Sequence, residues 1–391
     1  MRKKIALVNQ RYGLEVNGGS ELHCRQYAER LTRWYDVEVL TTCALDYTDW
    51  ANHYPEGESV INGVTVRRFP VERKRNKKVF DKLSDRVLNS SVSEADEERW
   101  IDEQGPYCPA CVEYIKEHHG DYTAVIFMTY LYYITARGVA ADIPNAFLLP
   151  TAHDEKPIYL KYYHKVFERV KGIIYNTAEE KAMIDRMFRV ESIPTVITAV
   201  GIDAPDESEL FDAKARYGLE DYILYVGRID ENKGCGTLFK YFAEYKKRNG
   251  GNLKLVLVGK AVIDIPKRDD IVYLGFVSDE EKFSLTKDAR LMVLASEFES
   301  LSMIVLESMF YGRPVLLNGR CEVLKGHCKR SNAGLYFTNY FEFEGALNYL
   351  LTHPEEYEIM RANARRYVNE NYRWDAIMKR LCDFIEKYGI I

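Results

Sequence analysis

The chain has 391 residues, of which 47% are hydrophobic and 29% are charged, and its formal net charge is -5. This balance is typical of a soluble globular protein and excludes a largely disordered chain. The length predicts two domains, at about 150 residues for each. The negative net charge gives no general attraction to nucleic acid, so an anionic ligand has to be met by local basic groups.

The N-terminal basic residues lead into a short apolar segment at residues 5–9, which is too short for a signal-peptide core or a membrane span. We therefore expect a cytoplasmic protein, and eight scattered cysteines favour reduced thiols over a disulfide framework. Cys108 and Cys111 have the spacing of a zinc-ligand pair. Because no second C-x2-C pair exists and Pro109 opens a helical pattern, we favour a helix start over a metal site.

Strand-like and helical segments alternate through the first half of the chain, which predicts a parallel, doubly wound sheet. The expected strands are residues 4–9, 37–42, 60–70 (two short strands around a turn), 123–129, 146–150, 172–176 and 195–200. The expected helices are residues 22–34, 79–88, 94–118 (interrupted at a Gly-Pro pair), 158–170 and 177–188. Residues 201–206 are polar and contain proline, and we interpret them as a linker.

Two stretches of the first half have chemistry suited to a ligand. Gly18-Gly19-Ser20-Glu21 follows the first strand and opens a helix capped near Gly19 and Ser20, where a glycine pair lets the backbone approach an anion. His153 and Asp154 follow the strand at 146–150 and are expected at the same edge of the sheet. The tyrosines of residues 130–133 end the preceding strand, and they either stack on sugars or pack in the core.

A basic run begins at Arg67 and precedes the helix at 79–88. Its cations are Arg67, Arg68, Arg73, Lys74, Arg75, Lys77 and Lys78. A basic amphipathic segment can lie on an anionic membrane, so residues 67–92 are a candidate for peripheral contact. The alternative, which we prefer, is a solvated loop followed by an ordinary packed helix.

The second half repeats the alternation, with strands expected at 222–226, 253–258, 271–275, 290–294 and 315–317. Further helices are expected from residue 237, at 303–311, 341–350 and 357–368, and from 373 to about 387. Arg228 and Lys233 lie in the loop after the first of these strands. A planar guanidinium and a flexible ammonium suit phosphate oxygens, although both residues could also be plain surface charge.

Glu299 and Glu307 are separated by seven mostly small or apolar residues. The first is expected in a strand-to-helix loop and the second about one turn inside the helix. In open parallel sheets such loops bind ligands, whereas acidic residues at a helix start also complement the helix dipole without any ligand.

Three of these motifs together resemble family-4 retaining glycosyltransferases, of the bacterial polysaccharide and lipopolysaccharide type called glycosyl transferase group 1. They are the G-G-x-E loop at 18–21, the V-G-R-I-x-x-x-K-G phrase at 226–234 and the E-x7-E pair at 299–307. The resemblance implies the GT-B fold of two Rossmann-like α/β domains. It implies an acceptor domain at 1–200, a nucleotide-sugar donor domain at 201–372, and a C-terminal helix at 373–391 that crosses back to the first domain.

The resemblance also implies roles for individual residues, with Glu299, His153, Arg228 and Lys233 as the catalytic set. The implied donor-binding residues are Gly18, Gly19, Arg228, Lys233, Phe276, Val277, Ser300, Leu301, Ser302 and Glu307. The co-substrate would be a nucleotide-diphosphate sugar, with no metal and no other cofactor, and the acceptor a glycan or lipid-linked sugar in cell-surface polysaccharide synthesis. The partners would then include no nucleic acid, and the location would be cytoplasmic or at the inner membrane face.

One departure from the family pattern lies between the two glutamates, where many relatives have G-F-G and this chain has Ser300-Leu301-Ser302. Three other functions stay open. A retaining glycosidase also uses paired carboxylates but has no use for the Arg228 and Lys233 pair. A GT-B sugar-nucleotide epimerase or phosphorylase would share most of the site, and a noncatalytic sugar-binding module is the alternative that is not an enzyme.

Overall fold

The computed structural model describes residues 2–16 and 18–390. The chain forms two compact units, and each is built around its own sheet. The first unit holds the chain up to Ala199 and again from Ile377 onward, and the second unit is Val200–Ala376. The chain therefore passes twice between the units.

The first unit contains an eight-stranded sheet in the order β3-β4-β2-β1-β5-β6-β7-β8. All neighbouring strands are parallel apart from β3, which pairs antiparallel with β4 as the first strand of a hairpin. The strands are β1 (Lys4–Val8), β2 (Asp36–Thr42), β3 (Gly57–Ile61), β4 (Val64–Phe69), β5 (Ala124–Met128), β6 (Ala146–Leu149), β7 (Gly172–Tyr175) and β8 (Thr195–Ile197). The order reverses between β1 and β5.

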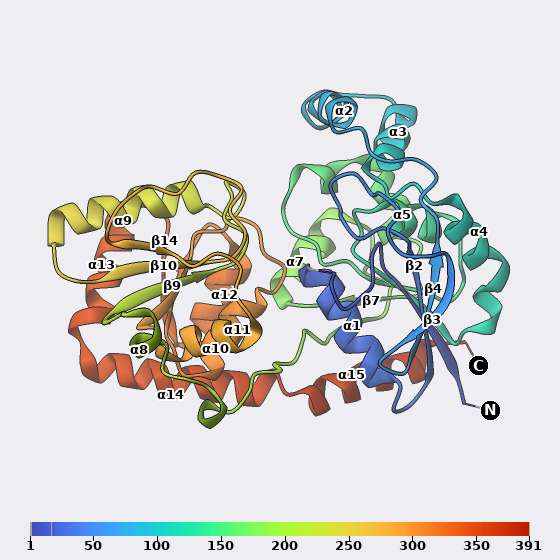
Figure 1. Cartoon of the computed structure of the whole chain (residues 1–391). Coiled ribbons are helices and arrows are strands. Elements are labelled where there is room, and N and C mark those ends of the chain that lie inside the picture. Colours follow the sequence, from blue (N-terminus) through green and yellow to red (C-terminus); the bar gives the residue numbers. More distant parts are fainter. Residues whose placement is uncertain (1, 17, 391) are drawn as a thin grey trace. The chain divides into compact units, whose positions relative to one another are not determined.

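Helices connect these strands and pack against them (Figure 1). They are α1 (Gly19–Leu31), α2 (Lys77–Asn89), α3 (Glu94–Gln104), α4 (Pro109–His118), α5 (Tyr133–Ala140), α6 (His164–Phe167) and α7 (Ala178–Met187). The C-terminal helix α15 (Trp374–Tyr388) belongs to the first unit from Ile377 onward. Three short 3-10 turns are η1 (His119–Asp121), η2 (Lys156–Tyr159) and η3 (Lys161–Tyr163). In Figure 1, α2 and α3 pack on each other and project from the sheet of this unit.

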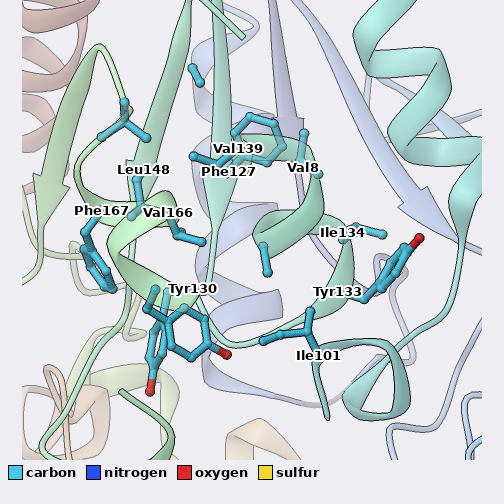
Figure 2. Close-up of a cluster of buried hydrophobic side chains, with 14 of the residues drawn as sticks. Val8, Ile101, Phe127, Tyr130, Tyr133, Ile134, Val139, Leu148, Val166 and Phe167 are labelled. Carbon is cyan, nitrogen blue, oxygen red and sulfur yellow. The ribbon is translucent and has the colours of Figure 1, made fainter. Parts of the chain in front are cut away.

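The central strands of the first unit are buried on both faces, so they carry continuous apolar runs. Every residue of β5 is buried, and Phe127 and Leu148 pack with Ile134 and Val139 of α5 (Figure 2). Tyr130 joins the same cluster, with its ring 4.8 Å from that of Tyr163. This core fixes the strand ends from which the polar loops of the first unit extend.

The second unit contains a six-stranded, wholly parallel sheet in the order β11-β10-β9-β12-β13-β14. Its strands are β9 (Tyr222–Val226), β10 (Lys254–Val258), β11 (Ile271–Tyr273), β12 (Leu291–Leu294), β13 (Val315–Asn318) and β14 (Gly334–Phe337). Its helices are η4 (Glu207–Glu209), α8 (Ala213–Tyr217), α9 (Cys235–Asn249), α10 (Asp279–Asp288), α11 (Met303–Phe310), α12 (Glu322–Ser331), α13 (Tyr340–Thr352) and α14 (Pro354–Asn371).

The order of the second sheet reverses between β9 and β12, which are neighbours in space but not in sequence. Loops at the carboxyl ends of strands on either side of such a reversal diverge and leave a crevice, which is the general ligand site of open α/β sheets. The loop after β9 contains Arg228 and Lys233, and the loop after β12 contains Glu299. The predicted phosphate-binding residues and the predicted sugar-binding residue therefore lie on adjacent loops.

One expected element is wrong. Residues 158–170 do not form a continuous helix but the two 3-10 turns η2 and η3 followed by the short α6. The backbone N–H of Tyr162 donates 2.8 Å to the carboxylate of Glu97 on α3, instead of to a carbonyl one helical turn earlier. A tertiary contact has here replaced the local hydrogen bond that an α-helix needs.

Smaller differences concern element ends and short elements. α1 begins at Gly19 with Gly18 as its N-cap, so the cap lies one residue earlier than expected, and Trp34 falls beyond the helix. Several short elements were not anticipated: α5, α8, α10, α12 and β14. Within residues 2–16 and 18–390, none of the helices has the length and apolar character needed to cross a membrane.

Candidate active site

The loop after β9 is held in shape by its own acidic residue. The guanidinium of Arg228 pairs with Asp230, and the other oxygen of Asp230 accepts the backbone N–H of Lys233 at 2.8 Å. The hydroxyl of Tyr225 donates 2.7 Å to the carbonyl of Arg228. The Asp230 carboxylate thus contacts both the Arg228 side chain and the Lys233 backbone. Both basic residues are therefore held at the carboxyl end of β9.

A glycine brings this loop against the loop after β12. Gly234, which is the N-cap of α9, has a φ of 70°, and a Cβ on it would lie 2.1 Å from the carbonyl oxygen of Ala295. Any other residue would therefore push the two loops apart. Close packing of the two loops therefore requires glycine at the last position of the V-G-R-I-x-x-x-K-G motif.

Lys233 and Glu299 form the contact between the two motifs, with Nζ 2.8 Å from Oε1. The Glu299 side chain is 14% exposed, and that of Lys233 is 32% exposed. The Arg228 side chain is 39% exposed. Both basic side chains are therefore partly accessible at this edge of the sheet.

The Ser300-Leu301-Ser302 segment keeps a glycine-like backbone although it has no glycine. Ser302 is the N-cap of α11 and has φ 64° and ψ 77°, in the left-handed region. The carbonyl of Leu301 accepts a hydrogen bond of 2.7 Å from Nε2 of His327, which is fully buried on α12. Nδ1 of the same ring lies 3.1 Å from the hydroxyl of Tyr367. A long-range contact thus fixes the conformation that glycine would otherwise permit.

Glu307 lies in the second turn of α11, as expected, and meets a residue that the sequence did not indicate. Its carboxylate is 3.2 Å from Nζ of Lys282 on α10. Burial raises the pKa of Glu307, and the Lys282 ammonium opposes that rise. The Glu307 side chain is 14% exposed.

The loop after β11 exposes an aromatic ring at the same carboxyl edge. Phe276 is 75% exposed, whereas Val277 is half-buried. Large apolar side chains so exposed are available for stacking on a ligand. A cavity of about 260 Å³ also opens at this edge, lined by residues that include Glu231, Phe298 and Arg320. A larger cavity of about 620 Å³ lies at the opposite edge, near Lys246 and Arg268.

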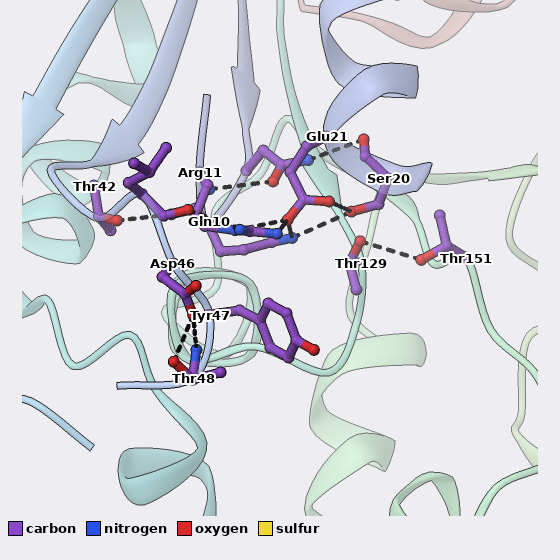
Figure 3. Close-up of polar contacts among 12 residues, drawn as sticks. Gln10, Arg11, Ser20, Glu21, Thr42, Asp46, Tyr47, Thr48, Thr129 and Thr151 are labelled. Atoms are coloured by element: carbon purple, nitrogen blue, oxygen red, sulfur yellow. Dashed lines mark hydrogen bonds and ion pairs between the residues drawn. The ribbon is translucent and has the colours of Figure 1, made fainter. Parts of the chain in front are cut away.

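In the first unit, the G-G-x-E loop is built around a buried ion pair (Figure 3). Nε of Arg11 lies 2.9 Å from Oε1 of Glu21, and the same oxygen accepts from Nε2 of Gln10 at 2.9 Å. A Cβ on Gly18 would lie 2.1 Å from the other Glu21 oxygen, whereas a Cβ on Gly19 would meet nothing within 4 Å. Gly18 therefore makes room for the glutamate, and Gly19 leaves open space at the N-terminus of α1.

His153 lies in the loop after β6, and its side chain is 29% exposed. Its Nδ1 is 3.5 Å from Oε1 of Glu155, which also accepts the hydroxyl of Tyr130 at 3.0 Å. The neighbouring Asp154 accepts a hydrogen bond of 2.6 Å from Tyr159. His153 thus occupies the predicted sheet edge, whereas Tyr130 and Tyr133 are buried and serve packing.

Most cations of the basic run are engaged within the first unit. Arg67 pairs with Glu38 and Glu58, Arg73 with Glu103, and Lys77 with Asp81. Arg75 is stacked between Trp50 and Phe80, and its guanidinium donates to backbone carbonyls. The run thus contributes largely to the packing of the first unit.

The cysteine pair lies where the helix pattern placed it. Pro109 is the first residue of α4, and Cys108 and Cys111 are buried with free thiols. Across the described parts of the chain, no group of three or more His, Cys, Asp or Glu residues is arranged to hold a metal ion.

Sequence comparisons place the second unit beside known glycosyltransferases. Residues 206–367 match the family model described as "Glycosyl transferases group 1". An uncharacterized glycosyltransferase of Methanocaldococcus jannaschii is 25% identical over 96% of this chain and 96% of its own length. The alpha-D-kanosaminyltransferase of Streptomyces kanamyceticus is 30% identical over 48% of this chain and 52% of its own length.

Solved structures share the fold over nearly the whole chain. Sucrose-phosphate synthase from Thermosynechococcus elongatus has a TM-score of 0.71 at 18% identity and covers 99% of both chains. The Anabaena protein HepE, solved with UDP and glucose, has a TM-score of 0.69 at 14% identity and covers 98% of this chain and 100% of its own. The fold is GT-B, as the resemblance implied. Residues 206–367 therefore resemble the group 1 glycosyltransferases, and a glycosyltransferase relative aligns over nearly the whole chain.

The second unit brings four predicted residues onto two adjacent loops and the helix that follows: Arg228, Lys233, Glu299 and Glu307. Gly18, Gly19 and His153 lie in the first unit. The sequence interpretation missed Lys282, His327 and Glu180, each of which holds a predicted residue or its loop. They come from other elements, and no local pattern marks them.

Proposed function

We propose that the protein is a retaining glycosyltransferase that moves a sugar from a nucleotide-diphosphate sugar to a glycan or lipid-linked acceptor in cell-surface polysaccharide synthesis. The observation that carries this proposal is the Lys233–Glu299 contact of 2.8 Å at the reversal of strand order. The contact brings together, on adjacent loops, a cation that can bind phosphate (Lys233) and a carboxylate that can accept hydrogen bonds from sugar hydroxyls (Glu299). The solved complexes of HepE with UDP-sugar ligands support the same class of donor.

In this proposal the donor lies along the carboxyl edge of the second sheet. Arg228 and Lys233 hold the diphosphate, Glu299 accepts hydrogen bonds from the sugar, and Glu307 accepts them from the ribose. The exposed ring of Phe276, with Val277 beside it, contacts the base, and backbone N–H groups of 300–302 contact sugar oxygens. Each hydrogen bond to a charged group contributes about 1.5–3 kcal/mol.

The transfer step needs no protein nucleophile in this mechanism. The bond between the anomeric carbon and the phosphate oxygen breaks, and the acceptor oxygen forms its bond on the same face of the sugar. The acceptor proton passes to the departing phosphate oxygen. Arg228 and Lys233 stabilise the charge that builds on the diphosphate, so the proposal calls on no metal and no further cofactor. His153 and Gly19 contribute from the first unit, to the sugar and the diphosphate respectively.

A thermal-shift screen with UDP, GDP and ADP and their glucose conjugates tests the donor site. A ligand that binds the folded state raises the melting temperature by linkage. Arg228→Ala should abolish the shift. Arg268→Ala is the matched control, since Arg268 also pairs with an aspartate two residues on, Asp270, but at the opposite edge of the sheet. A wild type that responds to none of the six compounds, or an Arg228→Ala variant that responds equally, contradicts the proposal.

The acceptor dependence of nucleotide release separates transfer from the related activities. A transferase releases nucleotide in step with sugar transfer to an added acceptor. An epimerase changes the sugar nucleotide without acceptor, and a binding module does neither. If the protein is a transferase, Glu299→Ala and Lys233→Ala should each abolish sugar transfer.

Peripheral contact with the inner membrane face, through residues 67–92, is a separate proposal. Lys74 and Lys78 are exposed, and Val79 is 44% exposed beside them, which supports a small basic and apolar surface at the start of α2. Sedimentation with vesicles of phosphatidylserine and phosphatidylcholine tests it. The proposal predicts binding that Lys74→Glu with Lys78→Glu removes and that high salt weakens. Absence of wild-type binding at low salt contradicts it.

A further inference from the structure

Two threonines in the first unit have a backbone conformation that threonine rarely adopts. Thr129 follows β5 with φ 67°, and Thr151 follows β6 with φ 48°. The left-handed region places Cβ close to the following carbonyl, and β-branched residues are true outliers there. Glycine or asparagine serves such a position at lower conformational cost.

The two residues meet at the carboxyl edge of the sheet. β5 and β6 are neighbouring parallel strands, and the hydroxyl of Thr151 lies 3.1 Å from that of Thr129 (Figure 3). Thr129 is 9% exposed, and Thr151 is half-buried. When one hydroxyl donates to the other, the pair keeps one free donor and spare lone pairs. The free donor and the lone pairs can form hydrogen bonds with the hydroxyl group of a ligand.

A buried carboxylate holds the strained loop in place. Glu180 of α7 is 1% exposed and accepts the backbone N–H of Ala152 at 2.6 Å and that of Asn176 at 2.7 Å. It thereby ties the loop after β6, which contains Thr151 and His153, to the loop after β7. Strained conformations persist where the surrounding structure over-determines them, and they cluster at functional sites.

Not every strand of this sheet is followed by a left-handed residue, although Ala199 after β8 is another one, with φ 62°. β1 and β7 end at the same edge of this sheet, and the residues that follow them are Asn9 and Asn176. Neither is among the described residues with a positive φ. A strand can therefore leave this edge without a left-handed residue. Thr129 and Thr151 both have a strained backbone, and their hydroxyl groups are paired. Glycine or asparagine at these positions would carry less backbone strain.

Resting on the proposed glycosyltransferase function, we propose that Thr129 and Thr151 form an acceptor subsite, in which the paired hydroxyls bind a hydroxyl group of the acceptor sugar or polyol. The left-handed backbone presents both hydroxyls at the sheet edge. Glu180 is the positioning residue that keeps the Thr151 side in place. The pair binds and orients the acceptor and takes no part in bond breaking.

The test uses variants that separate the hydroxyl from the backbone strain. Thr129→Val and Thr151→Val remove the hydroxyl and keep the branched side chain, Thr→Ser keeps the hydroxyl, and Thr→Gly removes both hydroxyl and strain. Asp142→Gly is the control, because Asp142 also has a positive φ, 57°, but precedes β6 at the opposite edge. Acceptor probes are methyl glucoside, methyl galactoside, methyl mannoside, N-acetylglucosamine and myo-inositol, with the nucleotide sugar that gives the largest wild-type thermal shift.

The subsite predicts that Thr→Val and Thr→Gly each lower kcat/KM for the acceptor about 3- to 10-fold, the value of one neutral hydrogen bond. Thr→Ser should retain activity, and nucleotide affinity should not change in any variant. The Gly variants should keep the wild-type melting temperature or exceed it. Asp142→Gly should leave kcat/KM unchanged.

Two results overturn the inference while leaving the transferase proposal standing. One is a wild type that transfers sugar while Thr129→Val and Thr151→Val match its kcat/KM. The other is a Thr→Gly variant with a melting temperature lowered by ten degrees or more, on the order of a lost structural contact, because the pair would then hold the fold together. A wild type that binds no nucleotide and transfers sugar to none of the five probes counts instead against the glycosyltransferase proposal.

Discussion

Nε2 of His327 donates a 2.7 Å hydrogen bond to the carbonyl of Leu301, and so a buried histidine on α12 holds the loop between the two glutamates. The loop has Ser-Leu-Ser where many relatives have G-F-G, and it still contains a left-handed residue at Ser302. Because the histidine is remote in sequence, the loop shape depends on the folded second unit as a whole.

His327→Ala should weaken nucleotide binding without touching the nucleotide. It leaves the Leu301 carbonyl without its buried donor, at a cost of about 1–3 kcal/mol in the free energy of unfolding. It also loosens the backbone N–H groups proposed to hold the sugar. His327→Gln keeps an N–H donor and should recover part of the affinity for a nucleotide sugar, as measured by calorimetry. Equal loss in both variants, with equal melting temperatures, would argue against a positioning role.

Acid should destabilise the protein through two buried histidines. Burial lowers the pKa of His327 to about 4 and that of His23 to about 3, both from an ordinary value near 6.5. The unfolded chain therefore binds more protons below pH 6.5, so stability falls as the pH falls from 6.5 toward these folded values. The slope is about 1.4 kcal/mol per pH unit for each histidine.

Chemical denaturation of wild type and His327→Gln at pH 7, 6 and 5 measures this contribution. The variant should lose stability less steeply, by about 1 kcal/mol less between pH 6 and pH 5. Parallel pH dependence in the two proteins would show that His327 has the same pKa in the folded and unfolded states.

The adjacent glycines of the G-G-x-E loop should respond in opposite ways to alanine. In Gly18→Ala the new Cβ overlaps the Glu21 carboxylate, which lies 2.1 Å away, and displaces it from Arg11. Disturbing a buried ion pair in this way should lower the free energy of unfolding by about 2–4 kcal/mol.

Gly19→Ala supplies the matched comparison, because its Cβ meets nothing within 4 Å and lies at the start of α1. Its stability should equal that of the wild type within about 1 kcal/mol. Its rate of sugar transfer should fall, since the methyl group occupies the open space proposed for the diphosphate. Denaturation and transfer assays on both variants provide the check, and a destabilised Gly19→Ala with normal transfer would reverse the assignment.

Ser302 provides a test of backbone strain beside the site. Ser302→Gly relieves the left-handed strain but adds unfolded-state entropy, so the free energy of unfolding should change by less than about 1 kcal/mol. Ser302→Val places a branched side chain at φ 64° and should lower it by about 1–3 kcal/mol. If Ser302→Val and Ser302→Gly have the same free energy of unfolding, Ser302 does not have a left-handed backbone.

Much of the architecture follows from local pattern, because the strands are short apolar runs and the helices have clear starts. β9 and β12 lie within the expected limits, and α11 has the expected start near Met303 and the expected end before Gly312. Parallel strands bring their carboxyl ends to one edge, so Lys233 and Glu299 could be expected close together. The pattern failed at residues 158–170, where Glu97 takes the hydrogen bond of Tyr162.

The residues that support the site were not predictable in this way. Lys282 meets Glu307 from α10, and Glu180 holds the loop of His153 from α7. Each acts across the fold on a partner more than twenty residues away, and its own neighbours in sequence give no sign of the contact. The left-handed threonines are similar, since φ at a β-branched residue cannot be deduced from a strand pattern.

Calorimetric titration of wild type and Lys233→Ala with UDP, GDP and ADP tests the central claim most directly. Lys246→Ala is the control, because Lys246 lines the cavity at the opposite edge of the second sheet. The account predicts that the wild type binds one of these nucleotides, that Lys233→Ala binds it about 10- to 100-fold more weakly, and that Lys246→Ala binds it normally. A wild type that binds none of them, or a Lys233→Ala variant of unchanged affinity, would contradict it.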